Sequence, residues 1–202
     1  MNAAIFFERN GILNSVRVEK QQQINPLTFA EFLINSEAVG PLQKLKAAGF
    51  ILIATTNQPG LSLGFQPRRE LDRMHALLKR DLGLDDVYTC PHSESDECRC
   101  RKPEPGLLFE AAHRWRLDLD HSFVVSDKWQ DALAAHNVGC TSLLLRSPWS
   151  KAGHHDFVLP SLADIASKIV QLQFGRIYPS ARRDPDAIPW VPNPAGSLQQ
   201  TW

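Results

Sequence analysis

The sequence predicts an α/β fold, with a mainly parallel sheet packed between two layers of helices in a three-layer, Rossmann-like core. Short apolar runs, typical of buried strands, alternate along the chain with longer segments whose apolar residues recur at helical spacing. Several of the short runs end abruptly in charged or amide residues. Because ligands bind at the carboxyl ends of the strands in open parallel sheets, these polar residues are the first candidates for a functional site.

The opening apolar run, residues 4–7, ends in charge and glycine, and we expect it to be a buried strand that carries Glu8 and Asn10 at its carboxyl end. Ser36 is expected to cap the helix that follows, and Gly49 is expected to end it. The remaining elements of the first half are a strand at 50–55, a helix at 67–82 and a short strand at 87–89.

The second half continues the alternation. A helix is expected to begin near Pro105, and the apolar strand at 122–126 ends at an acid, Asp127. Next come a helix that ends at Gly139, a strand at 141–145 and an amphipathic helix at 162–172. We expect a single domain over residues 1–174, followed by a proline-rich, flexible tail over residues 175–202.

The composition argues against several classes of protein. The 22 Lys and Arg residues balance the 22 Asp and Glu residues, so nothing favours nucleic acid or an acidic membrane surface as a partner. No apolar run approaches the roughly 18 residues that span a bilayer. Glu8, Arg9 and Asn10 interrupt the N-terminal apolar stretch, which argues against a secretion signal. A cytoplasmic monomer is the resulting expectation.

Three of the four cysteines lie with a histidine in one short loop, residues 90–100. In a reducing compartment this clustering favours a metal over disulfides, and three thiolates with one imidazole make a closed structural Zn²⁺ site. The expected ligands are Cys90, His92, Cys98 and Cys100. The alternative is a surface loop with incidental thiols. The fourth cysteine, Cys140, is expected to be a small core residue.

Two further polar clusters follow predicted strands. After the strand at 50–55, Thr56 and Asn57 open a turn that offers a reasonable phosphate cradle, although the same residues also make an ordinary turn. Arg101 and Lys102 come directly after the cysteine loop. The lysine could neutralise a phosphoryl group in its transition state; the alternative is a solvated basic pair.

Asp127 is a candidate ligand for Mg²⁺, an ion that takes oxygen ligands and keeps several waters. Its alternative role is to cap the helix that begins at Lys128. Each polar cluster is a modest signal by itself. All of them follow separate buried strands, however, so their loops are expected to converge on one rim of the sheet.

This ordered set of motifs resembles the haloacid-dehalogenase-type phosphatases, and within them the bacterial heptose bisphosphate and histidinol-phosphate phosphatases. The resemblance covers roughly residues 3–172. It is carried by the Thr-Asn-Gln turn at 56–58, the cysteine-rich run at 90–106, and Ser-Asp-Lys at 126–128 with Asp131. It implies a core without a large cap domain, an active-site Mg²⁺, a structural Zn²⁺ and phosphomonoester hydrolysis through an aspartyl-phosphate.

The resemblance also implies roles for individual residues. Thr56 and Asn57 would bind the phosphoryl group, and Lys102 would stabilise its charge. Arg101 and Lys128 would contact the substrate, a phosphorylated sugar or a similar small molecule.

The catalytic positions depart from the family pattern. The family carries two aspartates one residue apart, a nucleophile and a general acid/base, where this chain has Glu8 and Asn10. Glu8 keeps a carboxylate and Asn10 keeps a backbone carbonyl, so with Asp127 they could still hold Mg²⁺. Leu63, where relatives often have arginine, and Ser126, where glycine is usual, are milder departures.

Three hypotheses follow. The first is a working or weakly working sugar-phosphate phosphatase of the heptose bisphosphate class; the residue chemistry at positions 8 and 10 favours activity that is strongly reduced or lost. The second is a pseudophosphatase that binds a phosphorylated ligand or a protein partner without turnover. The third is a zinc-stabilised interaction module that uses Trp190 and Trp202 of the tail. The converging polar clusters and the balanced charge make the third the weakest of them.

Overall fold

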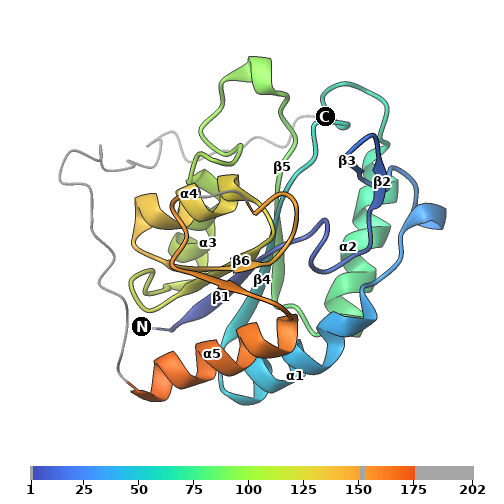
Figure 1. Ribbon diagram of the computed structural model, residues 1–202. Coiled ribbons are helices and arrows are strands. Elements are labelled where there is room, and N and C mark those ends of the chain that lie inside the picture. The colour runs from blue at the N-terminus through green and yellow to red at the C-terminus, as the bar shows by residue number, and fades with distance from the viewer. Residues whose placement is uncertain (1, 151–152, 176–202) are drawn as a thin grey trace.

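The computed structural model describes residues 2–150 and 153–175, and these residues form an α/β fold around one six-stranded, fully parallel sheet (Figure 1). The strand order across the sheet is β5-β4-β1-β6-β7-β8. The strands are β1 (Ala4–Glu8), β4 (Ile51–Asn57), β5 (Asp86–Cys90), β6 (Phe123–Ser126), β7 (Thr141–Leu145) and β8 (Phe157–Leu159). The predicted fold class is therefore confirmed.

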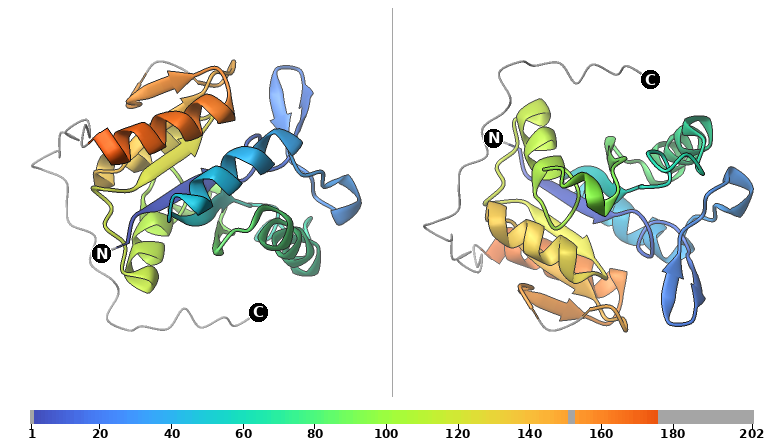
Figure 2. Two further views of the ribbon diagram at one scale, coloured as in Figure 1. Left: turned by 90° about the horizontal axis from the view of Figure 1, so that it is seen from below. Right: turned by 90° about the horizontal axis from the view of Figure 1, so that it is seen from above.

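Helices cover both faces of the sheet (Figure 2). Side chains of α1, α2 and α5 pack into the core on one face, and those of α3 and α4 pack into the core on the other. The helices are α1 (Val39–Ala47), α2 (Arg68–Leu82), α3 (Gly106–Trp115), α4 (Trp129–Val138) and α5 (Leu162–Gly175). Short 3-10 turns lie at Phe29–Glu31, Ser36–Ala38 and Glu94–Asp96.

The central strand β1 is buried along its whole length, between β4 and β6. Because successive side chains of a strand point to opposite faces, Ile5 and Phe7 enter the core under α1 and α5, whereas Ala4 and Phe6 enter the other core. This two-sided burial explains the unbroken apolar run and directs the end of β1 to the middle of the sheet's carboxyl edge.

The structure corrects one predicted cap. Ser36 does not cap the helix; it begins a 3-10 turn, and Asn35 caps that turn by accepting a hydrogen bond from the Glu37 backbone N–H at 3.1 Å. Both residue types cap well, and the extra turn moves the cap one position upstream. Gly139 ends α4 in the left-handed conformation, as predicted, and Gly83 ends α2 in the same way.

Two elements of the fold were not predicted from the sequence, the edge strand β8 and a hairpin of β2 (Arg17–Glu19) and β3 (Gln22–Ile24). The hairpin strands are short and mostly polar, with β2 exposed along its whole length and β3 partly exposed, so they lack the apolar run that indicates a buried strand. Their turn places Lys20 and Gln21 at positive φ without the glycine or asparagine that marks such turns. The hairpin stands at the carboxyl edge of the sheet, and no large cap domain accompanies it within the described ranges.

The proline-rich tail predicted for 175–202, including Trp190 and Trp202, lies beyond the described residues except for Gly175, which ends α5. None of the helices in the described part of the chain is long and apolar enough to cross a membrane.

Gly106 provides a test of the packing between α3 and the cysteine loop. A Cβ at this position would collide with the Arg99 backbone carbonyl, which accepts a hydrogen bond from the Gly106 N–H at 3.0 Å. We expect Gly106→Ala to lower the free energy of unfolding by about 1–3 kcal/mol, measured by urea denaturation.

Gly40→Ala in α1 is the matched control, because a Cβ there meets no atom within 4 Å. It should leave stability unchanged or raise it by up to about 1 kcal/mol. Equal destabilisation by the two substitutions would contradict the packing argument.

Candidate active site

The predicted polar clusters meet at the carboxyl edge of the sheet, around a cavity of about 100 Å³. Glu8 ends β1 and Asn10 follows it, Asn57 ends β4, and the segment after β6 brings its own polar side chains to the same place. The residues that line the cavity are Glu8, Asn10, Asn25, Asn57, Lys102, Lys128, Gln130 and Asp131. The expected convergence of loops is confirmed.

Lys102 is the buried centre of this site. Its ammonium group forms ion pairs with Glu8 Oε2 and with Asp131 Oδ1, the latter at 2.6 Å, and lies 3.3 Å from the Thr55 carbonyl oxygen. Burial would lower the pKa of Lys102, but the carboxylates of Asp131 and Glu8 raise it above its usual range. Lys102 is therefore charged at neutral pH, and a solvated basic pair is excluded for it.

The two carboxylates around Lys102 differ in their pKa values. Burial would raise the pKa of Glu8, but the ammonium groups of Lys102 and Lys128 hold it below the usual range. Burial raises the pKa of Asp131 despite the attraction of Lys102. Asp131 also accepts a hydrogen bond from the Ser126 hydroxyl at 2.9 Å.

Asn57 holds the backbone of Lys102 in place. Its Nδ2 donates to the Lys102 carbonyl at 3.1 Å, and its Oδ1 accepts from the Lys102 N–H at 3.1 Å. Thr56 is buried away from the cavity wall, and its hydroxyl accepts hydrogen bonds from Asn10 Nδ2 at 3.4 Å and Gln58 Nε2 at 2.9 Å. Arg101 lines a neighbouring cavity and donates to the His92 carbonyl at 3.1 Å.

Asp127 does not cap α4, because the cap position is Lys128, which forms no side-chain cap. Instead, Asp127 Oδ2 accepts a hydrogen bond from Gln23 Nε2 of the hairpin at 2.6 Å. Its Oδ1 is buried without a hydrogen bond.

The oxygens expected to hold Mg²⁺ surround the Lys128 ammonium group. That group donates to the Asn10 carbonyl at 2.7 Å and lies 3.4 Å from Asp127 Oδ1 and 3.7 Å from Glu8 Oε1. Two carboxylates and a carbonyl are the hard oxygen donors that Mg²⁺ prefers, and the unbonded Asp127 Oδ1 is available to it. The donor set therefore fits Mg²⁺, which would have to displace Lys128 from these oxygens.

Arg9 fixes the side chain of Asn10. The guanidinium is fully buried and donates two hydrogen bonds to Asn10 Oδ1, at 3.1 and 2.9 Å. It also lies 3.4 Å from His75 Nε2 and 5.4 Å from the centre of the Phe32 ring. Burial lowers the pKa of Arg9 to about 10, so it stays charged at neutral pH. No carboxylate within the described residues forms an ion pair with it.

The four predicted zinc ligands come together at the end of β5. One ligand atom from each of Cys90, His92, Cys98 and Cys100 lies within 4.8 Å of the others. The His92 Nδ1 to Cys100 Sγ distance is 3.3 Å, and the Cys90 and Cys98 sulfurs are 3.6 Å apart. A hydrogen bond with Cys100 lowers the pKa of Cys90 to about 5, which favours the thiolate that a metal needs.

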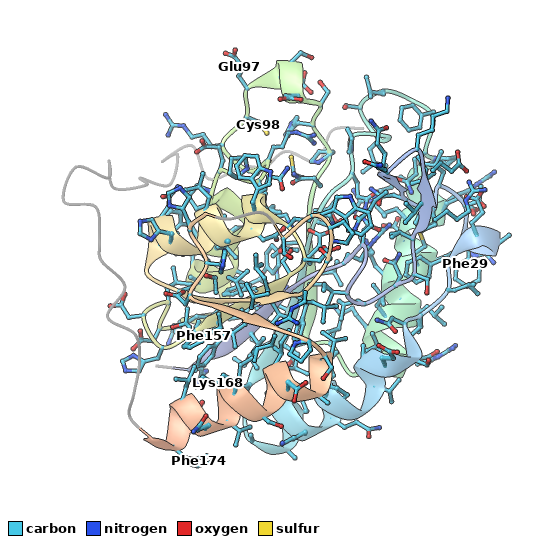
Figure 3. All side chains as sticks on the ribbon, viewed as in Figure 1. Phe29, Glu97, Cys98, Phe157, Lys168 and Phe174 are labelled. Carbon is cyan, nitrogen blue, oxygen red and sulfur yellow. The ribbon has the colours of Figure 1, made fainter. Side chains whose placement is uncertain are left out.

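The cysteine loop projects from the sheet, with Cys98 beside the exposed Glu97 (Figure 3). Its 3-10 turn is closed by Asp96, which accepts hydrogen bonds from the Ser93 N–H at 2.7 Å and hydroxyl at 2.8 Å. The loop leads directly to Lys102 and thus connects the metal-binding cluster to the cavity. Cys140 is buried in the core, as predicted.

Comparisons with known proteins identify the family. A family model described as HAD-hydrolase-like matches residues 99–165. A D-glycero-beta-D-manno-heptose-1,7-bisphosphate 7-phosphatase of Salmonella typhi is 34% identical over 188 residues, which cover 84% of this chain and 96% of that protein. The chain belongs to the HAD-like phosphatases. The resemblance inferred from the motifs is confirmed.

Two further members of this family extend the comparison. The phosphatase of the same name from Escherichia coli K12 is 33% identical over 188 residues, covering 84% of this chain and 95% of that one. The crystal structure of D,D-heptose 1,7-bisphosphate phosphatase from B. bronchiseptica, complexed with magnesium and phosphate, is 26% identical. It superposes with a TM-score of 0.73 over 85% of this chain and 99% of that one.

Three site residues were missing from the predicted set. Asp131 was part of a recognised motif but had no assigned role, although an acid in the first turn of the helix that follows Asp127 was a usable signal. Arg9 lay between the two expected catalytic positions, where its charge suggested exposure. Gln23 had no local signal, because only the fold brings the hairpin to Asp127.

The metal-binding cluster predicts a measurable dependence of stability on zinc. We expect elemental analysis to find about one Zn²⁺ per chain, and a strong chelator to lower the melting temperature, because metal binding contributes folding free energy. Cys98→Ser should bind less zinc, whereas Cys140→Ser, outside the cluster, should bind as much as the wild type. A well-folded protein without bound metal would contradict the assignment.

His75 predicts a pH dependence of stability. Burial and, next, the Arg9 guanidinium lower the pKa of His75 to about 3, well below its usual value of 6.5. Between these values the unfolded chain binds a proton that the folded chain does not, so the wild type loses stability as pH falls below 6.5.

Replacement by a residue that does not titrate isolates this effect. Compared with His75→Gln, the wild type should lose up to about 1.4 kcal/mol more per pH unit below pH 6.5. Urea denaturation at pH 7.5 and pH 5.0 measures the difference. Parallel pH profiles for the two proteins would show that His75 titrates normally.

Proposed function

We propose that this protein binds the phosphoryl group of a phosphorylated sugar, of the heptose bisphosphate class, in the cavity around Lys102, and that its phosphomonoesterase activity is strongly reduced or lost. The observation that carries the proposal is that Glu8 and Asn10 line the same cavity as the Lys102–Asp131 ion pair in a HAD-like phosphatase. The names of the relatives at 33–34% identity support the substrate class.

Glu8 takes the position of the nucleophile in this proposal. Its side chain is one methylene longer than aspartate, which displaces the carboxylate by about 1.5 Å, one C–C bond length. Glu8 Oε1 accepts a hydrogen bond from the Asn10 backbone N–H at 3.0 Å, and Glu8 Oε2 forms the ion pair with Lys102. A misplacement of roughly 1 Å can slow a reaction about a hundredfold.

Asn10 takes the position of the general acid/base, where an amide cannot act as a general acid or base near neutral pH. Loss of such catalysis costs typically about 10²–10⁴-fold in rate. Both ends of the amide are already occupied, its oxygen by Arg9 and its nitrogen by Thr56. The two losses need not multiply, because residues that act as a unit are non-additive.

Binding is less affected than catalysis. Lys102 and Lys128 place two ammonium groups at the cavity, and asparagine in place of aspartate removes one negative charge from a site that must accept a phosphate. Mg²⁺, held by Glu8, Asp127 and the Asn10 carbonyl, would add positive charge against the phosphoryl oxygens. Asn57 and Thr56 serve as positioning residues for Lys102 and Asn10. The zinc cluster is proposed to be structural.

The proposed location and partners follow the sequence-based expectations: a cytoplasmic monomer whose balanced charge favours neither nucleic acid nor a membrane surface. The second candidate function is a pseudophosphatase that uses the same cavity to bind a phosphorylated ligand or protein without turnover. The absence of a proton-exchanging group at position 10 favours it.

Restoring the aspartates tests the proposal. In a phosphate-release assay with Mg²⁺ and heptose bisphosphate, Glu8→Asp/Asn10→Asp should turn over at least about a hundredfold faster than the wild type, because both the nucleophile and the proton carrier return. The single replacements show which loss dominates. A wild type that is as fast as the double variant would overturn the claim of reduced activity.

A binding assay separates the two candidates from a protein without a phosphate site. Calorimetry with inorganic phosphate and Mg²⁺ should detect binding to the wild type and loss of binding in Lys102→Met. Binding without turnover, even in the double variant, would support the pseudophosphatase. Equal phosphate affinity in Lys102→Met and the wild type would contradict the role of Lys102.

A further inference from the structure

A second cavity, of about 270 Å³, lies beside the phosphoryl site. It is formed by the hairpin turn and β3, the start of α4, and the loop after β7. The residues that line it are Gln21, Gln22, Gln23, Lys128, Trp129, Gln130 and Trp149. Lys128 and Gln130 also line the phosphoryl cavity, so the two cavities are adjacent.

The lining of this second cavity is aromatic and uncharged except at its boundary. Two indole rings and four glutamine side chains surround it, no carboxylate lines it, and Lys128 lies where it meets the phosphoryl site. Glutamine amides both donate and accept hydrogen bonds. Ligand sites commonly combine such aromatic walls with a few polar groups that fix orientation.

One glutamine offers an unused acceptor. Gln23 Nε2 is committed to Asp127 Oδ2 at 2.6 Å, whereas Gln23 Oε1 is buried and has no hydrogen bond. A buried acceptor without a donor costs free energy that a ligand hydroxyl can recover. Gln23 therefore favours a ligand that carries hydroxyl groups.

Both tryptophans are positioned by segments next to Asp127. The Ser147 hydroxyl donates a hydrogen bond to the Asp127 backbone carbonyl at 3.1 Å and accepts one from the Trp149 backbone N–H at 3.1 Å. Trp129 is the first residue of α4, and 39% of its surface is exposed. Both indoles thus belong to the walls of a site whose position is set by the segment at Asp127.

The cavity on the other side of Trp129 has a different character. It measures about 380 Å³, and its lining includes the guanidinium groups of Arg99 and Arg101 together with three glutamates. Charged parts of a ligand have partners there. The 270 Å³ cavity has a cation only at its boundary with the phosphoryl site, so it does not suit a second phosphate.

We propose that the 270 Å³ cavity binds the uncharged polyhydroxyl part of the ligand, a sugar ring whose C–H face packs against Trp129 and Trp149 and whose hydroxyls bond to the glutamine amides. The assignment deepens the proposed function, since it rests on phosphoryl binding in the adjacent cavity for the orientation of the whole ligand. The affinity of the tryptophan cavity for a free sugar does not depend on that step.

Tryptophan-specific NMR tests the sugar site directly. In protein labelled with ¹⁵N-tryptophan, titration with mannose should shift the indole signals of Trp129 and Trp149, which Trp129→Phe and Trp149→Phe assign. The signal of Trp115 is the control, because its indole donates to Asp86 and lines none of the three cavities. Mannose that shifts neither Trp129 nor Trp149 would overturn the proposal.

A comparison of two ligands gives the energetic test. Trp149→Ala should weaken binding of mannose 6-phosphate about tenfold and leave binding of inorganic phosphate unchanged, whereas Trp115→Phe should change neither. Equal affinity of Trp149→Ala and the wild type for mannose 6-phosphate would overturn the proposal. If mannose shifts both indoles while inorganic phosphate fails to bind, the sugar site stands and the proposed function falls.

Discussion

The arrangement of the site depends on the buried ammonium group of Lys102. Without it, Glu8 would keep only Lys128, 3.7 Å away, and Asp131 would have no ion pair within the described residues, and a buried carboxylate without a partner costs several kcal/mol. Lys102 therefore joins the end of β1 to the first turn of α4. Its own backbone is held by Asn57 of β4, and the cysteine loop precedes it directly. The ends of β1 and β4, the first turn of α4 and the cysteine loop thus converge on one cation.

The parts of this site that could be predicted from sequence are those with a local signal. The apolar run of β1 locates Glu8, and the spacing of Cys90 to Cys100 predicts the cluster of three cysteines and a histidine that the fold brings together. The direction in which a side chain points has no such local signal. Thr56 and Asn57 are neighbours on one strand, so they point to opposite sides. Only Asn57 lines the cavity, while the Thr56 hydroxyl turns to Asn10. The polar hairpin and the partner of Gln23 depend on contacts between distant segments, which periodicity does not encode.

The buried side chain of Arg9 depends on Asn10 for its hydrogen bonds. A fully buried guanidinium normally has a carboxylate partner, yet here both of its strongest hydrogen bonds go to the neutral amide of Asn10. An aspartate at this position would complete an ion pair with Arg9. Asparagine accepts these hydrogen bonds through a neutral amide, which does not act as a general acid or base near neutral pH. The proposed loss of proton transfer therefore leaves the hydrogen bonds around position 10 in place.

Lys128 links the cation site to ligand binding. It shares the oxygens of Glu8, Asn10 and Asp127 with any divalent ion, and it stands at the boundary between the phosphoryl and tryptophan cavities. A divalent ion that takes these oxygens repels the ammonium group, and the nearest anionic partner then available to it is the ligand's phosphoryl group. Metal binding and phosphate binding are therefore coupled through Lys128 in the proposed site, so each should strengthen the other.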